Sequence, residues 1–297
     1  MEVWTVQRLL NWTTEYLAKK GIDSPRLSAE LLLGAVLGMK RIELYTRFDE
    51  VVDEDKRGRL RELVKRAGEH EPVAYLVGRT EFYSLEFEIS RECMIPRPET
   101  ELLVERAIEF LRGRDGEQYV CDLCTGCGCI AAAIAKNFTL CKIIATDISD
   151  AALEAASRNV AKHRIEGRVK LLRGDLFDAI VPELDVVRFD LVVCNPPYVS
   201  AGEIEMLEKS VRDYEPREAI YGGADGLDVY RRIIGRVSDF LKADGAIMLE
   251  IGYAQGQAVR GLLEESGVFE EIRIEKDLSN NDRIATAKKI KGMFRRQ

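Results

Sequence analysis

The sequence predicts an α/β protein in which a doubly wound, mostly parallel sheet follows a small all-α domain. Two patterns carry this prediction. Apolar residues at helical spacing fill roughly the first 70 positions, and strand-like and helix-like segments alternate from about residue 117 onward. This alternation is typical of parallel sheets, because each crossover helix returns the chain to the edge where the previous strand began.

An amino-terminal helical domain is expected over residues 1–80. Ser24 and Pro25 suit the cap and first turn of a helix. Helical spacing of apolar residues indicates helices over about 4–17, 25–37 and 54–67.

A strand or hairpin linker is expected over residues 81–98. Its apolar residues alternate as in a strand: Phe82, Leu85, Phe87 and Ile89. Pro96 and Pro98 then precede a helix that starts near Glu99, where the second domain, residues 99–297, is expected to begin.

The second domain contains the alternating elements. Strands are expected at 119–123, 142–146, 169–173, 189–194, 246–251, 272–274 and 283–287. Helices are expected at 130–135, 151–163, 229–241 and 255–263.

Composition and charge narrow the class of protein. The first residues lack the basic start and apolar stretch of a signal peptide, and no apolar run has membrane-spanning length, so a cytoplasmic protein without a membrane partner is expected. Residues 1–85 hold 14 Lys or Arg and 14 Asp or Glu, so the net charge of −7 arises after them. Duplex-binding enzymes are more often basic, which disfavours a stable nucleic-acid partner.

Four of the seven cysteines lie within nine residues: Cys121, Cys124, Cys127 and Cys129. Their spacing matches neither the ferredoxin run nor paired zinc knuckles. We therefore expect no metal site, and we expect the thiols to be free and buried in a reducing compartment.

A ligand-binding loop follows the first strand of the second domain. That strand ends in Asp122, and Cys124, Thr125, Gly126, Cys127 and Gly128 lead into a helix. Glycines let a backbone turn sharply and approach a ligand, and ligands of open α/β sheets bind at the carboxyl ends of strands. This stretch is therefore expected to bind a cofactor.

Two further acids follow the next strands. Asp147 lies 19 residues after Gly128, where a carboxylate can bind ribose hydroxyls. Asp175 follows the third strand and can reach an adenine amino group, with Leu176 packed on the ring. The loop spacing also fits nicotinamide-dependent oxidoreductases, so a nicotinamide cofactor remains an alternative at this point.

The segment Asn195-Pro196-Pro197-Tyr198 closes the fourth strand. The prolines stiffen the backbone, so the Asn195 side-chain oxygen and the Pro196 carbonyl can accept both hydrogens of a planar amino group while Tyr198 packs on its face. A nitrogen held there would lie beside a cofactor on the 122–128 loop. This pairing favours S-adenosylmethionine as the cofactor.

A cofactor loop paired with this segment resembles class I methyltransferases that modify planar amino groups. Further motifs resemble the peptide chain release factor glutamine methyltransferases over most of the chain. They are Glu71-Pro72-Val73-Ala74-Tyr75, Ile95-Pro96-Arg97-Pro98-Glu99-Thr100-Glu101, Tyr214-Glu215-Pro216, Gly222-Gly223-Ala224-Asp225-Gly226-Leu227 and Leu249-Glu250-Ile251-Gly252.

The resemblance implies a seven-stranded methyltransferase sheet and methylation of the glutamine side-chain nitrogen in the Gly-Gly-Gln loop of class I release factors. It implies that residues 124–128, Asp147, Leu176 and Asn195 contact S-adenosylmethionine, with Arg97 and Thr100 closing the pocket. Residues 195–198 would hold the glutamine, and the amino-terminal helices would grip the release factor. An adenine-N6 or other amino-group nucleic-acid methyltransferase remains the main alternative.

The chain departs from the family pattern at two places. Cys124 stands where glycine is common, which narrows the room beside the cofactor. Residues 277–283 contain no glycine before the last strand. Asparagine tolerates left-handed geometry, so Asn280 or Asn281 is expected to preserve the turn.

Overall fold

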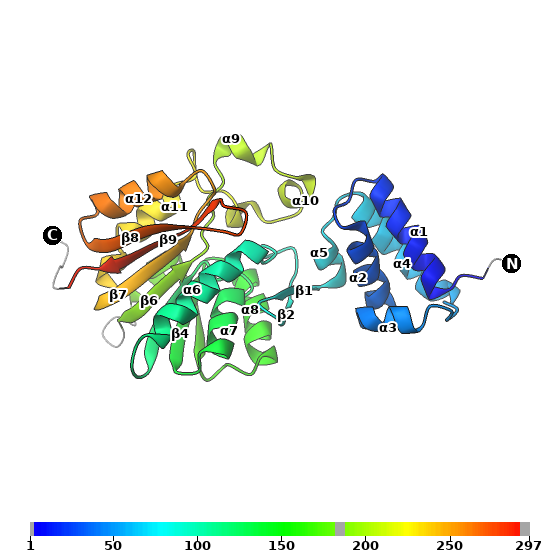
Figure 1. The fold of residues 1–297 in the computed structure, drawn as a ribbon, viewed down its shortest axis with the longest axis horizontal. Coiled ribbons are helices and arrows are strands. Elements are labelled where there is room, and N and C mark those ends of the chain that lie inside the picture. The colour runs from blue at the N-terminus through cyan, green and yellow to red at the C-terminus, as the bar shows by residue number, and fades with distance from the viewer. Residues whose placement is uncertain (1–2, 182–187, 292–297) are drawn as a thin grey trace. The chain divides into compact units, whose positions relative to one another are not determined.

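The computed structural model describes residues 3–181 and 188–291, which form two compact units (Figure 1). One unit comprises residues up to 79 together with 208–214, and the other comprises 80–207 and the residues from 215 onward. The chain therefore leaves the second unit once, contributes a short segment to the first, and returns. No described helix is both long and apolar enough to cross a membrane.

The first unit is helical. Thr5 and Asp53 cap two of its helices, because their side chains accept the backbone N–H groups of Arg8 and Lys56. Ser24 precedes another helix, but its hydroxyl makes no capping bond. Leucines from the long helices form a closed core. The helices are α1 (Val6–Lys19), α2 (Pro25–Leu37), α3 (Arg41–Thr46), α4 (Glu54–Gly68), α5 (Val73–Val77) and α10 (Lys209–Arg212).

The second unit contains the expected sheet of seven strands, in the order β5-β4-β3-β6-β7-β9-β8. The first five strands of this order are parallel, while β9 runs antiparallel to both β7 and β8. The segment Phe189–Cys194 is apolar except for Asp190 and is buried along its whole length, as central parallel strands require. The strands are β3 (Gln118–Leu123), β4 (Cys141–Asp147), β5 (Val169–Arg173), β6 (Phe189–Cys194), β7 (Leu241–Glu250), β8 (Phe269–Lys276) and β9 (Asp282–Lys289).

Helices cover both faces of this sheet. Figure 1 shows α6, α7 and α8 on one face and α11 and α12 on the other. These helices are α6 (Glu101–Arg112), α7 (Cys129–Asn137), α8 (Asp150–Lys162), α11 (Asp228–Ile234) and α12 (Gly256–Glu265). Short turns join them: η1 (Pro98–Thr100), η2 (Leu176–Ala179), α9 (Ala201–Ile204), η4 (Arg217–Ala219) and η5 (Val237–Asp239).

One expected helix is wrong in extent. The apolar spacing over 229–241 predicts a single helix, yet α11 ends at Ile234 and β7 already begins at Leu241. Phe240 and Leu241 are buried because they pair with the start of β6, where the Phe189 N–H donates to the Phe240 carbonyl at 2.8 Å. Tertiary pairing at the sheet thus overrides a helical pattern.

A hairpin lies between the helical unit and α6. Its strands are β1 (Arg79–Phe82) and β2 (Leu85–Glu88), and its two turn residues have φ of 50° at Tyr83 and 58° at Ser84. A two-residue turn with positive φ at both positions has a backbone twist that matches the right-handed twist of the two strands it joins. The Tyr83 N–H donates to the Glu101 carboxylate at 2.8 Å, which ties the turn to the start of α6.

The turn between β8 and β9 is formed without glycine. Asn280 adopts a φ of 64°, in the left-handed region, as expected from its sequence. The Asp277 carboxylate accepts the N–H groups of Ser279 at 2.9 Å and Asn281 at 3.0 Å, and it pairs with Arg283 at 3.1 Å. A side-chain scaffold therefore supports the turn.

Replacement of Asn280 by valine is expected to lower the free energy of unfolding by about 1–2 kcal/mol, because a β-branched residue fits left-handed geometry poorly. Asn280→Gly should stay within about 1 kcal/mol of the wild type. Urea unfolding followed by circular dichroism measures both. Ser279→Val is the matched control at an exposed neighbour without positive φ. Equal losses of unfolding free energy at positions 279 and 280 would contradict a role for the left-handed geometry of Asn280.

Candidate active site

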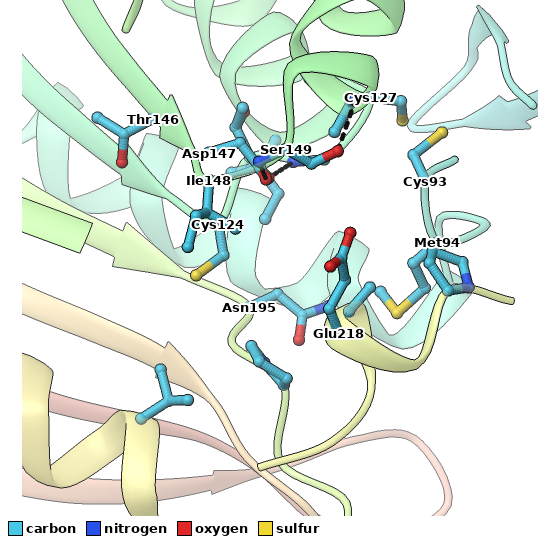
Figure 2. A pocket seen from close by; sticks show the side chains of 18 of the residues that line it. Cys93, Met94, Cys124, Cys127, Thr146, Asp147, Ile148, Ser149, Asn195 and Glu218 are labelled. Carbon is cyan, nitrogen blue, oxygen red and sulfur yellow. Dashed lines mark hydrogen bonds between the residues drawn. The ribbon is translucent and has the colours of Figure 1, made fainter. Parts of the chain in front are cut away.

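A cavity of about 400 Å³ opens at the carboxyl ends of the central parallel strands. Its size lies within the range of small-molecule sites. Figure 2 shows residues of the β3 and β4 loops on one side of it and Asn195, Glu218 and Met94 on the other. The lining includes Glu92, Cys93, Met94, Pro96, Thr100, Cys124, Thr125, Gly126, Cys127, Asp147, Ile148, Asp175, Leu176, Asn195, Pro197, Glu218 and Arg232.

The loop after β3 forms one wall. Its backbone is held to the neighbouring strand, because the Thr125 N–H donates to the Thr146 carbonyl at 2.9 Å. Cys124 has a φ of 54°, so this cysteine occupies the conformation that glycine adopts without strain. A non-glycine residue there costs about 1–2 kcal/mol of backbone strain.

Asp122 lies behind this loop. Its side chain is fully buried (0% exposed) and does not line the cavity. One carboxylate oxygen accepts the Thr125 hydroxyl at 2.5 Å and the Ala131 N–H at 3.2 Å. Burial raises the pKa of Asp122 to about 7. Asp122 therefore holds the loop against α7 from within the protein. Gly128, also outside the lining, starts α7 where an added Cβ would approach Ala156 at 3.2 Å.

The acid that ends β4 and the acid that follows β5 both line the cavity. Asp147 accepts the N–H groups of Gly126 at 2.8 Å and Ser149 at 3.0 Å, so its carboxylate joins two loops. Burial raises the pKa of Asp147. Asp175 pairs with Arg232 at 2.6 Å, and Leu176 beside it is buried with a φ of 51°.

The segment after β6 forms the opposite wall. Asn195 and Pro197 line the cavity, whereas Pro196 and Tyr198 do not. The Asn195 amide nitrogen donates to the Thr100 hydroxyl at 3.2 Å. The Tyr198 hydroxyl donates to the buried Glu250 carboxylate at 3.4 Å, and burial raises the pKa of Tyr198. The segment is thus anchored from behind.

A glycine-rich stretch packs directly on this segment. A Cβ at Gly222 would lie 2.7 Å from the Pro197 carbonyl oxygen, and one at Gly226 would lie 2.3 Å from the Tyr198 carbonyl oxygen. Only glycine permits this approach of two backbones. The Gln255 amide completes the packing, since it donates to the Tyr198 carbonyl at 2.9 Å.

Residues 92–100 close a third side; the resemblance implied Arg97 and Thr100 there, whereas nothing in the sequence pattern singled out residues 92–94. Glu92, Cys93 and Met94 line the cavity, as does Thr100. Arg97 does not; it pairs instead with the buried Glu215, whose other oxygen accepts the Ile95 N–H at 3.4 Å. Burial raises the pKa of Glu215. Glu218, Arg232 and Ile148 were also not singled out, because each lies in an irregular or helical stretch without a distinctive pattern.

The seven cysteines are all free. Cys121 and Cys194 are buried in β3 and β6, while Cys124, Cys127 and Cys129 contribute to the cavity wall. Among the residues that the structure describes, no group of three or more His, Cys, Asp or Glu side chains is placed to hold a metal ion.

Comparison with known proteins agrees with this architecture. A model of the PrmC N-terminal domain matches residues 8–78, and a model of the methyltransferase small domain matches residues 99–212. A methyltransferase from Pyrococcus furiosus shares the fold with a TM-score of 0.52 at 18% identity, over 70% of this chain and 91% of that one.

The release factor glutamine methyltransferase of Rhodopirellula baltica is 43% identical over 289 residues, which cover 96% of this chain and 97% of that protein. The one from Geobacter sulfurreducens is 39% identical over 266 residues, or 90% of each chain. These relatives span nearly the whole sequence, so the likeness includes both units.

The mixed seven-stranded sheet, with its loop after β3 facing the Asn-Pro-Pro-Tyr segment after β6, defines a class I methyltransferase. The chain belongs to the release factor glutamine methyltransferase family. The family and the fold class expected from the sequence are therefore confirmed.

The buried Asp122 gives a signed prediction for stability. Its pKa in the folded protein, about 7, exceeds that of an unfolded aspartate, about 3.9, so the folded state binds the extra proton between these values. The stability from this proton is complete below about pH 4 and is lost as pH rises through about 7. In the wild type, this proton makes the free energy of unfolding fall with rising pH by up to about 1.4 kcal/mol per pH unit, and Asp122→Asn should remove this slope.

Urea unfolding of wild type and Asp122→Asn between about pH 4 and about pH 8 tests this slope. Asp55→Asn, at an exposed position of α4, is the matched control and should keep the wild-type dependence. Identical slopes in wild type and Asp122→Asn would contradict the argument.

Proposed function

We propose that this chain transfers the methyl group of S-adenosylmethionine to the side-chain amide nitrogen of the glutamine in the Gly-Gly-Gln loop of class I peptide release factors. The supporting observation is one cavity with the β3 loop and Asp147 on one wall and Asn195 and Pro197 on the other. The near full-length identity to release factor glutamine methyltransferases supports the choice of substrate.

The residues of the cavity fit S-adenosylmethionine. Four carboxylates line it against a single arginine, an acidic balance that suits a ligand with a sulfonium and an ammonium group. The four are Glu92, Asp147, Asp175 and Glu218. When bound, the cofactor supplies an electrophilic methyl group.

Each wall has a proposed contact with the cofactor. Asp147 would bind the ribose hydroxyls, and Asp175 with Leu176 would bind adenine. The backbone of residues 124–127 and the Thr100 side chain would border the rest, while Gly128 would support the loop from behind, where it packs on Ala156. Asp122 and Arg97 act from behind the wall, since neither lines the cavity: Asp122 accepts the hydroxyl of the lining residue Thr125, and Arg97 pairs with Glu215.

The Asn195–Tyr198 segment would hold the substrate amide. The Asn195 side-chain oxygen and the Pro196 carbonyl accept the two amide hydrogens, and Pro197 borders the site. Tyr198 is tied to Glu250, so its role is to fix the segment. An amide nitrogen is a weak nucleophile, and these bonds raise its electron density and aim its lone pair. Such positioning supplies about 7–11 kcal/mol in favourable cases.

The helical unit is the proposed contact for the body of the release factor. Residues 8–78 match the amino-terminal domain model of this family, and the unit has a core of its own. It contributes no residue to the cavity lining, so its proposed role is recognition of the protein substrate.

Transfer of a labelled methyl group from S-adenosylmethionine to a purified class I release factor tests the function. Label should enter the wild-type factor and be lost when the Gly-Gly-Gln glutamine is changed to alanine. Label on added DNA or RNA in place of the factor would overturn the protein substrate and support nucleic-acid methylation.

Asn195→Ala should lower kcat about 100-fold, because the substrate amide nitrogen is no longer oriented toward the methyl group. The Kd for S-adenosylmethionine, measured by calorimetry, should change little, since the other walls remain. Asn137→Ala, at an exposed site at the end of α7, serves as control. A near wild-type rate for Asn195→Ala would sink the proposed role.

A further inference from the structure

A buried chain of hydrogen bonds runs from the cavity wall into the core of the second unit. The Asn195 amide nitrogen donates to the Thr100 hydroxyl at 3.2 Å, and that hydroxyl donates to the Glu250 carboxylate at 2.6 Å. Thr100 and Glu250 are 2% and 1% exposed. Three side chains far apart in sequence thus form one relay, in which Asn195 and Thr100 border the cavity and Glu250 lies behind it.

The direction of this relay follows from chemistry. A carboxylate only accepts hydrogen bonds, so the single O–H of Thr100 must donate to Glu250. Its oxygen can then only accept from Asn195, which turns the Asn195 amide nitrogen toward Thr100. The Asn195 oxygen is left to face the cavity. The two ends of an amide have the same shape, and therefore only these partners distinguish them.

We infer that Glu250, acting through Thr100, is a positioning residue that sets which end of the Asn195 amide faces the substrate. An outward oxygen accepts a hydrogen from a substrate amide. An outward nitrogen would instead donate, and so would favour a carboxylate. The relay therefore selects glutamine over glutamate. This inference rests on the proposed function.

The surroundings of Glu250 keep its carboxylate responsive to pH. Arg283 on β9 and the hydroxyls of Thr100 and Tyr198 favour the charged form, while Glu99 opposes it. The Tyr230 hydroxyl faces the same residue but bonds its backbone carbonyl at 2.9 Å. Burial outweighs these groups and raises the pKa of Glu250 to about 7.

Protonation reverses the relay. A neutral Glu250 can donate to the Thr100 oxygen, which frees the Thr100 proton for the Asn195 oxygen and turns the amide nitrogen outward. We expect kcat to fall as pH drops below about 7. Glu250→Gln should flatten this acid limb, because an amide at 250 donates and accepts at every pH.

Thr100→Val tests the relay while it leaves the Glu250 charge in place. Binding of two release factors, one with Gly-Gly-Gln and one with Gly-Gly-Glu, is measured by calorimetry with S-adenosylhomocysteine present. The preference for glutamine should fall about tenfold in Thr100→Val and in Glu250→Gln, the size expected for one hydrogen bond to a charged group. Thr100→Ser, which retains the hydroxyl, should recover most of it.

A double variant separates a relay from two independent effects. Thr100→Val with Glu250→Gln should lose no more glutamine preference than Thr100→Val alone, because the second residue acts through the first. Two matched controls should keep wild-type preference and rate. They are Thr286→Val, at a buried threonine of β9 outside the cavity lining, and Glu265→Gln, at an exposed site in α12.

The outcomes distinguish the inference from the proposed function. An unchanged glutamine preference in Thr100→Val, or additive losses in the double variant, would overturn the relay while wild-type methylation stands. A wild-type protein that does not methylate the release factor at all would overturn the proposed function itself.

Discussion

The register of the three central strands is the constraint on which the site depends. Leu123 of β3 pairs with Thr146 of β4 on one side and with Cys194 of β6 on the other. The chain therefore leaves all three strands at the same level, and the loop at 124, the acid at 147 and the amide at 195 begin side by side. A shift of one residue in either pairing would turn one of these side chains to the opposite face of the sheet. Backbone pairing in the core thus sets which side chains meet at the cavity.

Buried carboxylates stabilise this arrangement from behind. Asp122 braces the β3 loop, Glu215 ties down residues 95–97, and Glu250 ends the relay to Asn195. Each receives hydrogen bonds from the segment that it holds, which offsets part of the cost of burying a charged group. None of the three lines the cavity. Of the acids that do line it, Asp147 also holds two loops together and Asp175 pairs with Arg232, so support of the wall and exposure to the cavity meet in the same side chains.

Much of this could be predicted from the sequence. Alternating apolar segments predicted the sheet and its order of elements, and the polar residues that follow β3, β4 and β6 predicted where a site would form, because parallel strands end at one edge. The relay could not be predicted, since Thr100 and Glu250 meet only through folding, 150 positions apart in the chain. The end of α11 was missed for a related reason, since it depends on a contact between distant segments. Phe240 and Leu241 continue the helical pattern of apolar residues, but in the folded chain they pair with the start of β6.

The short excursion of the chain at 208–214 changes how the two units can be separated. Because this segment belongs to the helical unit while its flanks belong to the sheet unit, the polypeptide passes between them at three places. The Tyr214 hydroxyl bonds the Glu69 carbonyl at 3.1 Å within the helical unit. Expression of residues 1–79 alone would therefore omit part of that unit. A protease cut between 79 and 80 would leave no covalent bond between the two fragments, but residues 208–214 of the second fragment would still dock on the first. A nicked protein would therefore keep its helical unit until this segment detached.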